Sequence, residues 1–573
     1  MNSRFLCRVS RLAAIGAILL GSASCIKINE ELGESLIPTD QTWDVYPQDA
    51  VDLQDIRLQM TGNLSGYNTS RFTFGAVNDG ILGTSVRSAS FTLVPVRDTV
   101  DLGKNTKVRR FHFSAVRDTL SMVNDNEIKM LQNVYVSELK KPLDSTILYM
   151  NSLSDPAVLD EYVDLSKRIT TGIPVYGGGD SLSFDFSLEY AEKVVAKIDE
   201  AQKAGKTDSV QNFINYLPGI YITTDAPAGR GGRINMFDLE LENSSGYVTG
   251  NYAELCITAE YDYSEEPVDT SFLFFFGPAD YIRYNEDSKS LVYPSQYAFN
   301  SSDHATSEIY KEGVRAADKI YVEGGAGVKP VIKAEEIKQI LEAQMAEAGI
   351  QDPSQVVINK ATVILPYNVE ENYGLLEKYP DILSPTVRYT TEDDKYITYA
   401  GLTDASISSE NQGDINRSLN MYCPDISYHV QQILNLDRDD EDYAKKIENY
   451  DIWFLIMHEE VTVTSNNNSY YNNYPYDYYY NSMMYDPYGY GYGGYGGYGG
   501  YGYGGYGYGS YGYSNYYNYA MMSMMYSSMD TTSESVSTEL DKDRFYRAVL
   551  NGPDAAGAKP QFKVTFSAPK SAE

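Results

Sequence analysis

Cys25 is the residue whose type and setting predict a definite chemistry, the acylation of its thiol. It directly follows the small residues 21–24, which are preceded by an apolar stretch, 12–20, and by three arginines near the start of the chain. A positive, then apolar, then small-residue order is that of a secretory signal. The apolar stretch is too short to span a bilayer, which needs about 20 apolar residues. We therefore expect residues 1–24 to be a signal peptide that is removed.

The small residues before Cys25 resemble a lipobox, the motif at which a cysteine is diacylated and then becomes the new N-terminus. Ser22 stands where Leu is more usual, a relaxed form that is common in lipoproteins of Bacteroidota. Each buried CH₂ of an acyl chain contributes about 0.8 kcal/mol, so several chains, such as palmitate, give a stable membrane anchor. We expect this anchor on Cys25; the alternative is an ordinary signal peptide that contains a cysteine.

Residues 25–45 have the composition of a lipidated tether, with Gly33, Pro38 and few apolar residues in a regular pattern. The acidic pair Glu30 and Glu31 is similar to the signal that sends Bacteroidota lipoproteins to the cell surface. We therefore expect an outer-membrane lipoprotein displayed at the cell surface. A solvated tether that faces the periplasm is the alternative.

The rest of the chain lacks a recognisable catalytic or metal-binding motif such as GxSxG or HExxH. The glycine run 324–327, followed by Lys329 and a proline, lacks the GxxxxGK[ST] spacing of a phosphate loop, so we expect a tight turn. The acidic runs 393–394 and 439–442 lack the spacing of an EF-hand, which favours solvated loop charge. We therefore expect no catalytic residues, no cofactor and no bound metal.

The four histidines lack partners at metal-ligand spacing, and strand-like surroundings predict packed or edge positions for two of them. Those two are His112 and His458; the others are His304 and His429. Outside the signal and the lipid site, the cysteines are Cys256 and Cys423, far apart in sequence and each in an apolar, strand-like stretch. Two separate buried thiols are expected, with a single disulfide as the alternative.

The acidic composition excludes one class of partner. The formal net charge is −33 and the isoelectric point is near 4.5, so the chain will not hold a nucleic-acid backbone electrostatically. No segment after the signal approaches 18 consecutive apolar residues, and the lipid is therefore the expected membrane anchor.

Serines and threonines that follow Asp and precede an aliphatic residue or Thr predict O-glycosylation, because Bacteroidota modify exported proteins at such triplets. Chance gives some of these triplets, so the modification is a hypothesis. The positions are Thr99, Thr119, Ser145, Ser181, Ser209 and Thr531.

Short runs of alternating apolar and polar residues, separated by turn residues, predict a mainly β fold. Examples are 91–96, 111–114, 134–136, 183–186 and 220–223. Such spacing favours antiparallel sandwiches, jelly-roll-like in class. Apolar residues at helical spacing predict one amphipathic helix over 189–203 and another over 334–348, and a short helix is expected near 427–434. Continuous apolar runs, as at 452–456, predict core strands.

These patterns suggest two related β-sandwich domains, each with one amphipathic helix. Between 465 and 530, repeats of Tyr and Gly flanked by Asn-rich and Met-rich runs leave no aliphatic core, and this composition predicts disorder. The expected divisions are a signal peptide (1–24), a tether (25–45), a first β-sandwich (46–283), a linker (284–307), a second β-sandwich (308–464 with 531–568) and a Tyr/Gly/Asn/Met-rich insertion (465–530).

Several stretches, taken in order, resemble a Bacteroidota family of cell-envelope lipoproteins of unknown function. The first is Leu32-Gly33-Glu34-Ser35-Leu36-Ile37-Pro38, which follows the lipidated cysteine. Others are 74–84, with Phe-Gly, Asp and Leu-Gly-Thr; 213–222, with Leu-Pro-Gly-Ile-Tyr-Ile; 320–328; and 359–366. The resemblance implies a cell-envelope lipoprotein and brings no catalytic residues.

The sequence therefore predicts a non-catalytic cell-envelope lipoprotein that binds a glycan or a protein. One alternative is a structural or adhesive protein that associates with itself through the Tyr/Gly insertion, since exposed tyrosines stack on sugars and on each other. A β-sandwich hydrolase with an unrecognised carboxylate pair is the other, because fold does not determine function.

Overall fold

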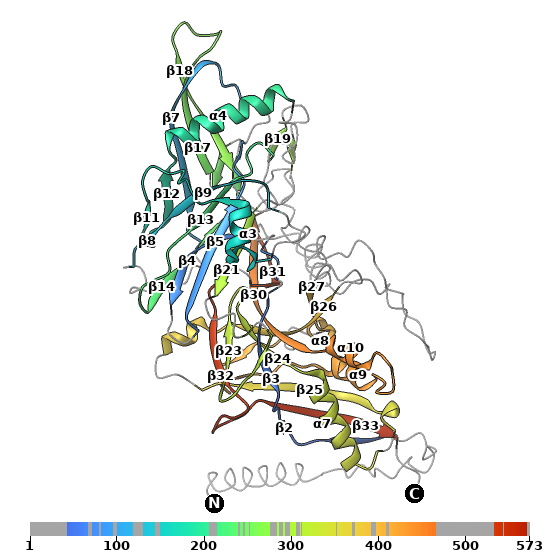
Figure 1. Ribbon diagram of the computed structural model, residues 1–573. Helices are drawn as coiled ribbons and strands as arrows, with labels where there is room; N and C mark the ends of the chain where they lie inside the picture. Colours follow the sequence, from blue (N-terminus) through green and yellow to red (C-terminus); the bar gives the residue numbers. More distant parts are fainter. Residues whose placement is uncertain are drawn as a thin grey trace, which may run out of the picture.

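The computed structural model shows two β-rich domains, one above the other in Figure 1. It describes residues 43–62, 64–66, 71–78, 82–95, 100–118, 130–143, 149–205, 215–238, 241–244, 247–250, 252–275, 283–285, 290–292, 298–304, 310, 312–350, 352–368, 373–390, 397–407, 412–465, 532–541 and 544–569. All strand pairings among these residues are antiparallel, and the predicted mainly β class is confirmed.

The first domain, residues 71–304, contains two large sheets. Sheet I runs in the order β10 (Val163–Asp164), β9 (Tyr135–Leu139), β13 (Ile220–Thr223), β5 (Thr84–Phe91), β4 (Arg71–Asn78) and β14 (Gly231–Asp238), with β21 (Ala298–His304) also paired to β5. Sheet II runs in the order β12 (Ser181–Asp185), β7 (Lys104–Val116), β17 (Tyr252–Glu260), β18 (Val268–Phe275) and β6 (Val94–Pro95).

Alternating side chains from both sheets form the core of the first domain. On β7, Phe111, Phe113 and Ala115 are buried while their neighbours are more exposed, which is the period of a half-buried strand. Phe113 lies between Phe91 of sheet I and Phe184 of β12, with ring centroids 5.9 and 4.7 Å away. The contact between Phe113 and Phe91 joins the two sheets face to face, as the alternating pattern predicted, whereas Phe184 lies beside Phe113 in sheet II.

Helix α4 (Leu188–Lys203) covers one side of this core, where the sequence predicted an amphipathic helix. The hydroxyl of Ser187 accepts a hydrogen bond from the backbone N–H of Tyr190 at 3.2 Å and so caps the first turn. Tyr190, Val194 and Ile198 recur at four-residue spacing, and all three are buried against the sheets. A short helix, α3 (Pro156–Tyr162), precedes it.

The second domain contains the other two large sheets. Sheet III runs in the order β22 (Val314–Arg315), β3 (Ile56–Met60), β24 (Val328–Ile332), β30 (Ile452–Ser465), β26 (Ile382–Thr390) and β27 (Ile397–Gly401), with β31 (Thr532–Leu540) also paired to β30. Sheet IV runs in the order β1 (Trp43–Pro47), β33 (Gln561–Pro569), β25 (Val357–Pro366), β29 (Met421–Tyr422) and β28 (Ile415–Asn416), with β2 (Val51–Asp52) also paired to β33.

Helices pack into the second domain beside these sheets. Helix α7 (Ala334–Glu347) and helix α9 (Ser427–Leu434) lie where the sequence predicted helices, and α8 (Thr403–Ile407) and α10 (Tyr443–Glu448) accompany them. Asp451 caps α7 from a distant point in the sequence, because its carboxylate accepts the backbone N–H of Ala334 at 3.0 Å. Helices α7 and α9 share one hydrophobic core with residues from sheets III and IV.

Strand pairing moves two of the expected domain limits. Residues 43–60 were expected to divide between the tether and the first sandwich, yet β1 pairs with β33 and β3 pairs with β24, so they belong to the second domain. Residues 284–307 were expected to form a linker, yet β21 pairs with β5 over its whole length and buries Phe299. The polar sequence of β21 hid this strand, because Asn300 and Ser302 are buried polar residues.

Four two-stranded pairs complete the described structure: β8 (Gln132–Asn133) with β11 (Val175–Tyr176), β15 (Leu241–Ser244) with β16 (Tyr247–Gly250), β19 (Arg283–Asn285) with β20 (Ser290–Val292), and β23 (Lys319–Glu323) with β32 (Arg547–Asn551). Among the described helices, none is long and apolar enough to cross a membrane. The Tyr/Gly-rich segment 466–531 lies outside the described residues; Ser465, expected within it, instead ends β30 and pairs with Thr532.

Candidate functional site

Charged side chains are buried where the two domains meet, and they are the most unusual group in the described structure. Buried charges are rare unless they are paired. The first domain supplies Arg87 from β5 and His304 from β21, and the second supplies Glu323 at the end of β23, Lys329 from β24 and Asp541 just after β31. All five are buried, so each must be stabilised by its neighbours.

His304 and Glu323 contact each other between the domains. Nδ1 of His304 lies 2.9 Å from Oε2 of Glu323, and Nε2 of the same ring lies 2.5 Å from the hydroxyl of Ser302. Burial favours the neutral form of Glu323, but the charges of His304, Lys329 and Arg87 outweigh it and hold its pKa below the usual value. The carboxylate is therefore ionised inside the interface.

The glycine turn 324–327 binds a cation through its carbonyl groups. Nζ of Lys329 donates to the carbonyl oxygens of Glu323, Gly325 and Gly327, the last two at 3.0 and 3.3 Å. A phosphate loop presents N–H groups instead, so the carbonyl orientation fits the expected turn and not anion binding. Burial lowers the pKa of Lys329 to about 7, although Glu323 nearby favours the charged form.

Arg87 packs directly against this glycine turn. A Cβ atom on Gly325 would lie 1.9 Å from one guanidinium nitrogen of Arg87, and Gly325 has a φ of +59°. Only glycine gives both the left-handed backbone and the space for the guanidinium. The turn and the arginine therefore fit each other across the domain boundary.

A second histidine–carboxylate pair lies in the same region of the second domain. Nδ1 of His458 is 3.4 Å from Oδ2 of Asp541, and Nε of Arg544 is 3.6 Å from the same oxygen. Oδ1 of Asp541 accepts the backbone N–H of Arg544 at 2.8 Å. The charge of Asp541 also acts on Lys329, and that of Arg71 in the first domain acts on Arg544, so the charged groups form one network.

This interdomain network consists of side chains that neutralise one another. Its lysine is enclosed by backbone carbonyls, and its carboxylates face a histidine or an arginine. Breaking one partner of such a buried pair leaves an uncompensated charge, which costs about 3–5 kcal/mol. This arrangement therefore holds the two domains together.

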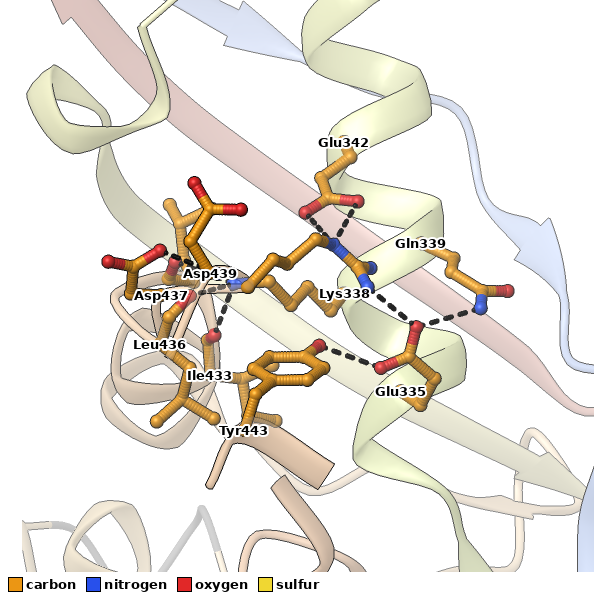
Figure 2. A network of polar contacts seen from close by, with 11 residues as sticks. Glu335, Lys338, Gln339, Glu342, Ile433, Leu436, Asp437, Asp439 and Tyr443 are labelled. Carbon is orange, nitrogen blue, oxygen red and sulfur yellow. Dashed lines mark hydrogen bonds and ion pairs between the residues drawn. The ribbon is translucent and has the colours of Figure 1, made fainter. Parts of the chain in front are cut away.

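A separate polar network joins α7 to the segment after α9 (Figure 2). Nε of Arg438 lies 2.7 and 3.1 Å from the two carboxylate oxygens of Glu342, and Nη1 donates to Glu335 at 3.0 Å. Nζ of Lys338 donates to the carbonyls of Ile433 and Leu436, as Figure 2 shows, at 3.2 and 2.5 Å. A cation there satisfies the free carbonyls at the C-terminal end of α9.

The acidic residues that follow α9 stabilise turns of the backbone. Asp437 and Asp440 accept the backbone N–H groups of Asp439 and Asp442, each at 2.9 Å, and Lys446 pairs with Asp440. Among the described residues, no group of three or more His, Cys, Asp or Glu side chains could hold a metal ion. The other acidic run, 393–394, lies outside the described residues.

The turn between β17 and β18 presents an exposed aromatic ring. Tyr263 is 74 % exposed and stacks on the buried Tyr261, with ring centroids 5.1 Å apart. Polar groups surround it: Nζ of Lys104 lies 2.6 Å from Asp262, and the amide of Asn105 donates to Glu260 at 2.8 Å. We call Lys104, Asn105, Glu260, Asp262 and Tyr263 the apical patch.

The apical patch lies at the end of the first domain away from the second. The strand β7 begins at Lys104 in the patch and leads to Asp118, which pairs with Arg71 near the interdomain network. A strand rises about 3.3 Å per residue, so the two ends of β7 are roughly 40 Å apart. In Figure 1, β18 stands at the top of the molecule and β33 at its base.

The residues predicted from the sequence as sites fall mostly outside the described residues. This holds for Cys25, Thr99, Thr119, Ser145, Ser209 and Thr531. Ser181 begins β12 and is exposed, which leaves its hydroxyl accessible. Cys256 and Cys423 are free thiols on different domains, and burial raises the pKa of each, so the disulfide alternative is wrong for this structure.

The histidines have different surroundings. His112 lies on β7 beside Asp185, with Nδ1 2.7 Å from the carboxylate. His429, in α9, donates from Nε2 to the carbonyl of Tyr450 at 2.8 Å, and burial lowers its pKa to about 4. His304 and His458 belong to the interdomain network, a role that single-sequence patterns did not indicate because their partners lie far away in the chain.

Comparisons with protein-family models, with curated proteins and with solved structures find no match to this chain. The resemblance to Bacteroidota lipoproteins therefore stays a prediction from the sequence.

Proposed function

We propose that this protein is a lipid-anchored, non-catalytic protein of the cell envelope, displayed at the cell surface, that binds a glycan or an envelope protein through the apical patch. The lipid expected on Cys25 and the export signal predicted before it support a location at the outer membrane. The observation that supports binding is the exposed Tyr263, because Tyr261 stacks beneath it and holds its ring in the solvent.

The apical patch has the chemistry of a sugar-binding surface. An exposed aromatic face attracts the apolar C–H face of a sugar ring. The stacking of Tyr263 on Tyr261 stabilises the position of the ring, since an aromatic pair contributes about 0.5–1.5 kcal/mol. Carboxylates of Glu260 and Asp262 and the amide of Asn105 are hydrogen-bonding groups for hydroxyls beside that ring. A peptide with an aromatic or cationic side chain would use the same groups.

The charged groups with the most unusual environments support a non-catalytic role. Lys329 has a pKa near neutrality, as a general base requires, but its ammonium group is buried and donates to the carbonyl groups of the glycine turn. The pair His304 and Glu323 is likewise buried between the domains. These groups stabilise the body that carries the apical patch.

Binding is tested with the purified mature chain on a glycan array and in pull-downs from envelope extracts. Tyr263→Ala is expected to lower the affinity at least about tenfold, the effect of about 1.4 kcal/mol. Tyr428→Ala removes a tyrosine that is also exposed, but on α9 in the second domain, and should bind like the parent chain. Equal binding by both variants, or an empty array and empty pull-downs, would overturn the assignment.

The anchor and its orientation have separate tests. Growth with labelled palmitate should label the parent chain and not Cys25→Ala. Protease treatment of intact cells should release the body from the surface; protection until the outer membrane is opened would instead place it in the periplasm.

A second candidate function is self-association through the Tyr/Gly segment, and one observation favours it. β30 and β31 pair in register to Ser465 and Thr532, so residues 466–531 leave and re-enter the fold at adjacent points. The segment is thus an insertion in a hairpin that leaves the pairing intact. Deleting 466–531 should reduce adhesion and sedimentation of the chain; unchanged values would reject this candidate.

A further inference from the structure

We propose that the outward face of sheet IV rests on an anionic lipid bilayer, the membrane to which the protein is anchored. The proposal depends on the lipid attachment in the proposed function and adds an orientation and a contact surface. We call Trp43, Val45, Val357, Lys360 and Lys563 the membrane face. The observations that carry it are the register of three strands, the charges on that face, and the point where the chain enters it.

Strand register brings the apolar members of the membrane face together. Ser567 of β33 pairs with Val45 of β1 on one side and with Val357 of β25 on the other, so the two valines flank it. Trp43 lies one outward position further along β1, opposite Pro569. Trp43, Val45 and Val357 are 49 %, 61 % and 47 % exposed, which is high for residues of their size.

The opposite face of the same strands is the core. Tyr46 of β1 stacks on Phe566 with ring centroids 5.6 Å apart, and Val564 and Ala361 are buried beside them. Residues alternate between the two faces of a strand, so the exposed tryptophan and valines cannot turn inward. They form a flat apolar surface on a rigid sheet.

Charge on the membrane face has the opposite sign to the charge on the whole chain. Two lysines, Lys360 and Lys563, lie on this face. No Asp or Glu occupies an outward position of β1, of 357–362 in β25 or of 563–569 in β33, although the chain has a net charge of −33. Asp52, at the far end of β33, pairs with Gln561. Lysines near an anionic membrane surface are attracted to it.

The side chains have the chemistry of a membrane interface. Tryptophan favours the headgroup level, where its ring is half in the apolar region and its N–H remains in a polar one. Lysines extend their charged ends past neighbouring apolar groups to reach phosphates. A single tryptophan with two valines gives weak contact alone, which suits a surface that is already held near the bilayer.

The chain enters the fold on this face. Trp43 is the first described residue, and residues 26–42 separate it from Cys25. Fully extended, these residues reach at most roughly 60 Å, and the lipid therefore keeps β1 at a high local concentration near the bilayer. No other exposed apolar surface of the described strands is so close to the anchor along the chain.

The natural tryptophans provide the test. The sequence has two, Trp43 on the membrane face and Trp453, which is buried in sheet III. Lipidated Trp453→Phe protein, purified from its membranes, is reconstituted into vesicles of phosphatidylethanolamine and cardiolipin, with and without brominated acyl chains. Trp43 emission should fall about twofold in the brominated vesicles, because bromine quenches a ring at the interface. Trp43→Phe protein, which reports Trp453, should show no quenching.

Matched valine variants identify the face. Val45→Glu and Val357→Glu, added to Trp453→Phe, should each abolish the quenching of Trp43. Val175→Glu, at a position that is 54 % exposed on β11 in the first domain, should leave it unchanged. Circular dichroism of each variant shows whether the fold is retained.

Other occupants of this face give other results. Trp43 emission that is blue-shifted but not quenched by bromine overturns the proposal, since protein then covers the ring: a second copy if the detergent-solubilised chain sediments as a dimer, residues 26–42 if it is a monomer. Equal, unshifted emission in both vesicles also overturns it. Failure to incorporate palmitate would instead reject the anchor in the proposed function, which keeps the two failures distinct.

Discussion

Nδ1 of His304 lies 2.9 Å from Oε2 of Glu323, and this contact joins the last residue of a strand in one domain to the last residue of a strand in the other. Both side chains are buried. The packing of the domains therefore includes a buried histidine–carboxylate contact as well as apolar area.

Glu323→Gln should destabilise the protein by about 3–5 kcal/mol, because it leaves His304, Lys329 and Arg87 without their shared anion. Denaturant unfolding measures the difference. Asp262→Asn is the matched control: it removes an exposed carboxylate that pairs with Lys104, and should change stability by less than about 1 kcal/mol. Equal effects of the two substitutions would contradict the role of Glu323.

Gly325→Ala should destabilise far more than Gly172→Ala. Both glycines have positive φ, +59° and +79°, so each alanine carries backbone strain of order 1 kcal/mol. Only at Gly325 would the new Cβ collide with Arg87, at 1.9 Å, whereas nothing lies within 4 Å at Gly172. The difference between the two unfolding free energies measures the fit of Arg87; similar values would show that the turn can move away.

The local parts of the fold were predictable. Alternation at Phe111 and Phe113 and helical spacing over 334–348 are signals within a short window, and the structure has β7 and α7 there. The pairing of β1 with β33 leaves no such signal, because the two strands are separated by almost the whole chain.

The candidate sites were predictable only in part. The glycine run 324–327 is a turn, as predicted, but it joins β23 to β24, where a turn between a strand and a helix was expected. The binding of Lys329 by its carbonyls could not be predicted, since backbone orientation depends on the finished fold. Arg87, His304 and Glu323 come from three separate elements, and none has a local pattern that points to the others. The apical Tyr263 has only an ordinary turn sequence around it.

His429 should make the protein less stable in mild acid. Burial holds its pKa at about 4, whereas an unfolded histidine titrates near 6.5. Between these values the unfolded state binds a proton that the folded state does not, so stability falls as pH decreases from 6.5 to 4, by about 3 kcal/mol in total.

The comparison uses His429→Gln, which cannot titrate and keeps an amide that can donate to the carbonyl of Tyr450. Unfolding free energies are measured from pH 8 to pH 4. The variant should lose less stability over the lower part of this range, while its difference from the parent at pH 8 reports packing alone. Parallel curves would show that His429 titrates normally.

Replacing residues 466–531 by an Asn-Gly turn should preserve the fold and stabilise it. The register between Ser465 and Thr532 allows a short hairpin loop there. If the segment is as disordered as its composition predicts, shortening the loop this much reduces the closure cost by about 3 kcal/mol. An altered far-ultraviolet circular dichroism spectrum, or a lower denaturation midpoint, would show that the segment contributes to folding.

The position of β33 in sheet IV also determines when the second domain can finish folding. The last described strand pairs with β1, β2 and β25, so the earliest and the middle strands of sheet IV have no shared partner until the C-terminal residues are made. The first domain, contained between residues 71 and 304, needs none of these residues for its own sheets. During synthesis the first domain can therefore form before the second domain, whose sheet IV is completed only when β33 is added. A stop codon before Gln561 would leave a folded first domain attached to an incomplete second domain.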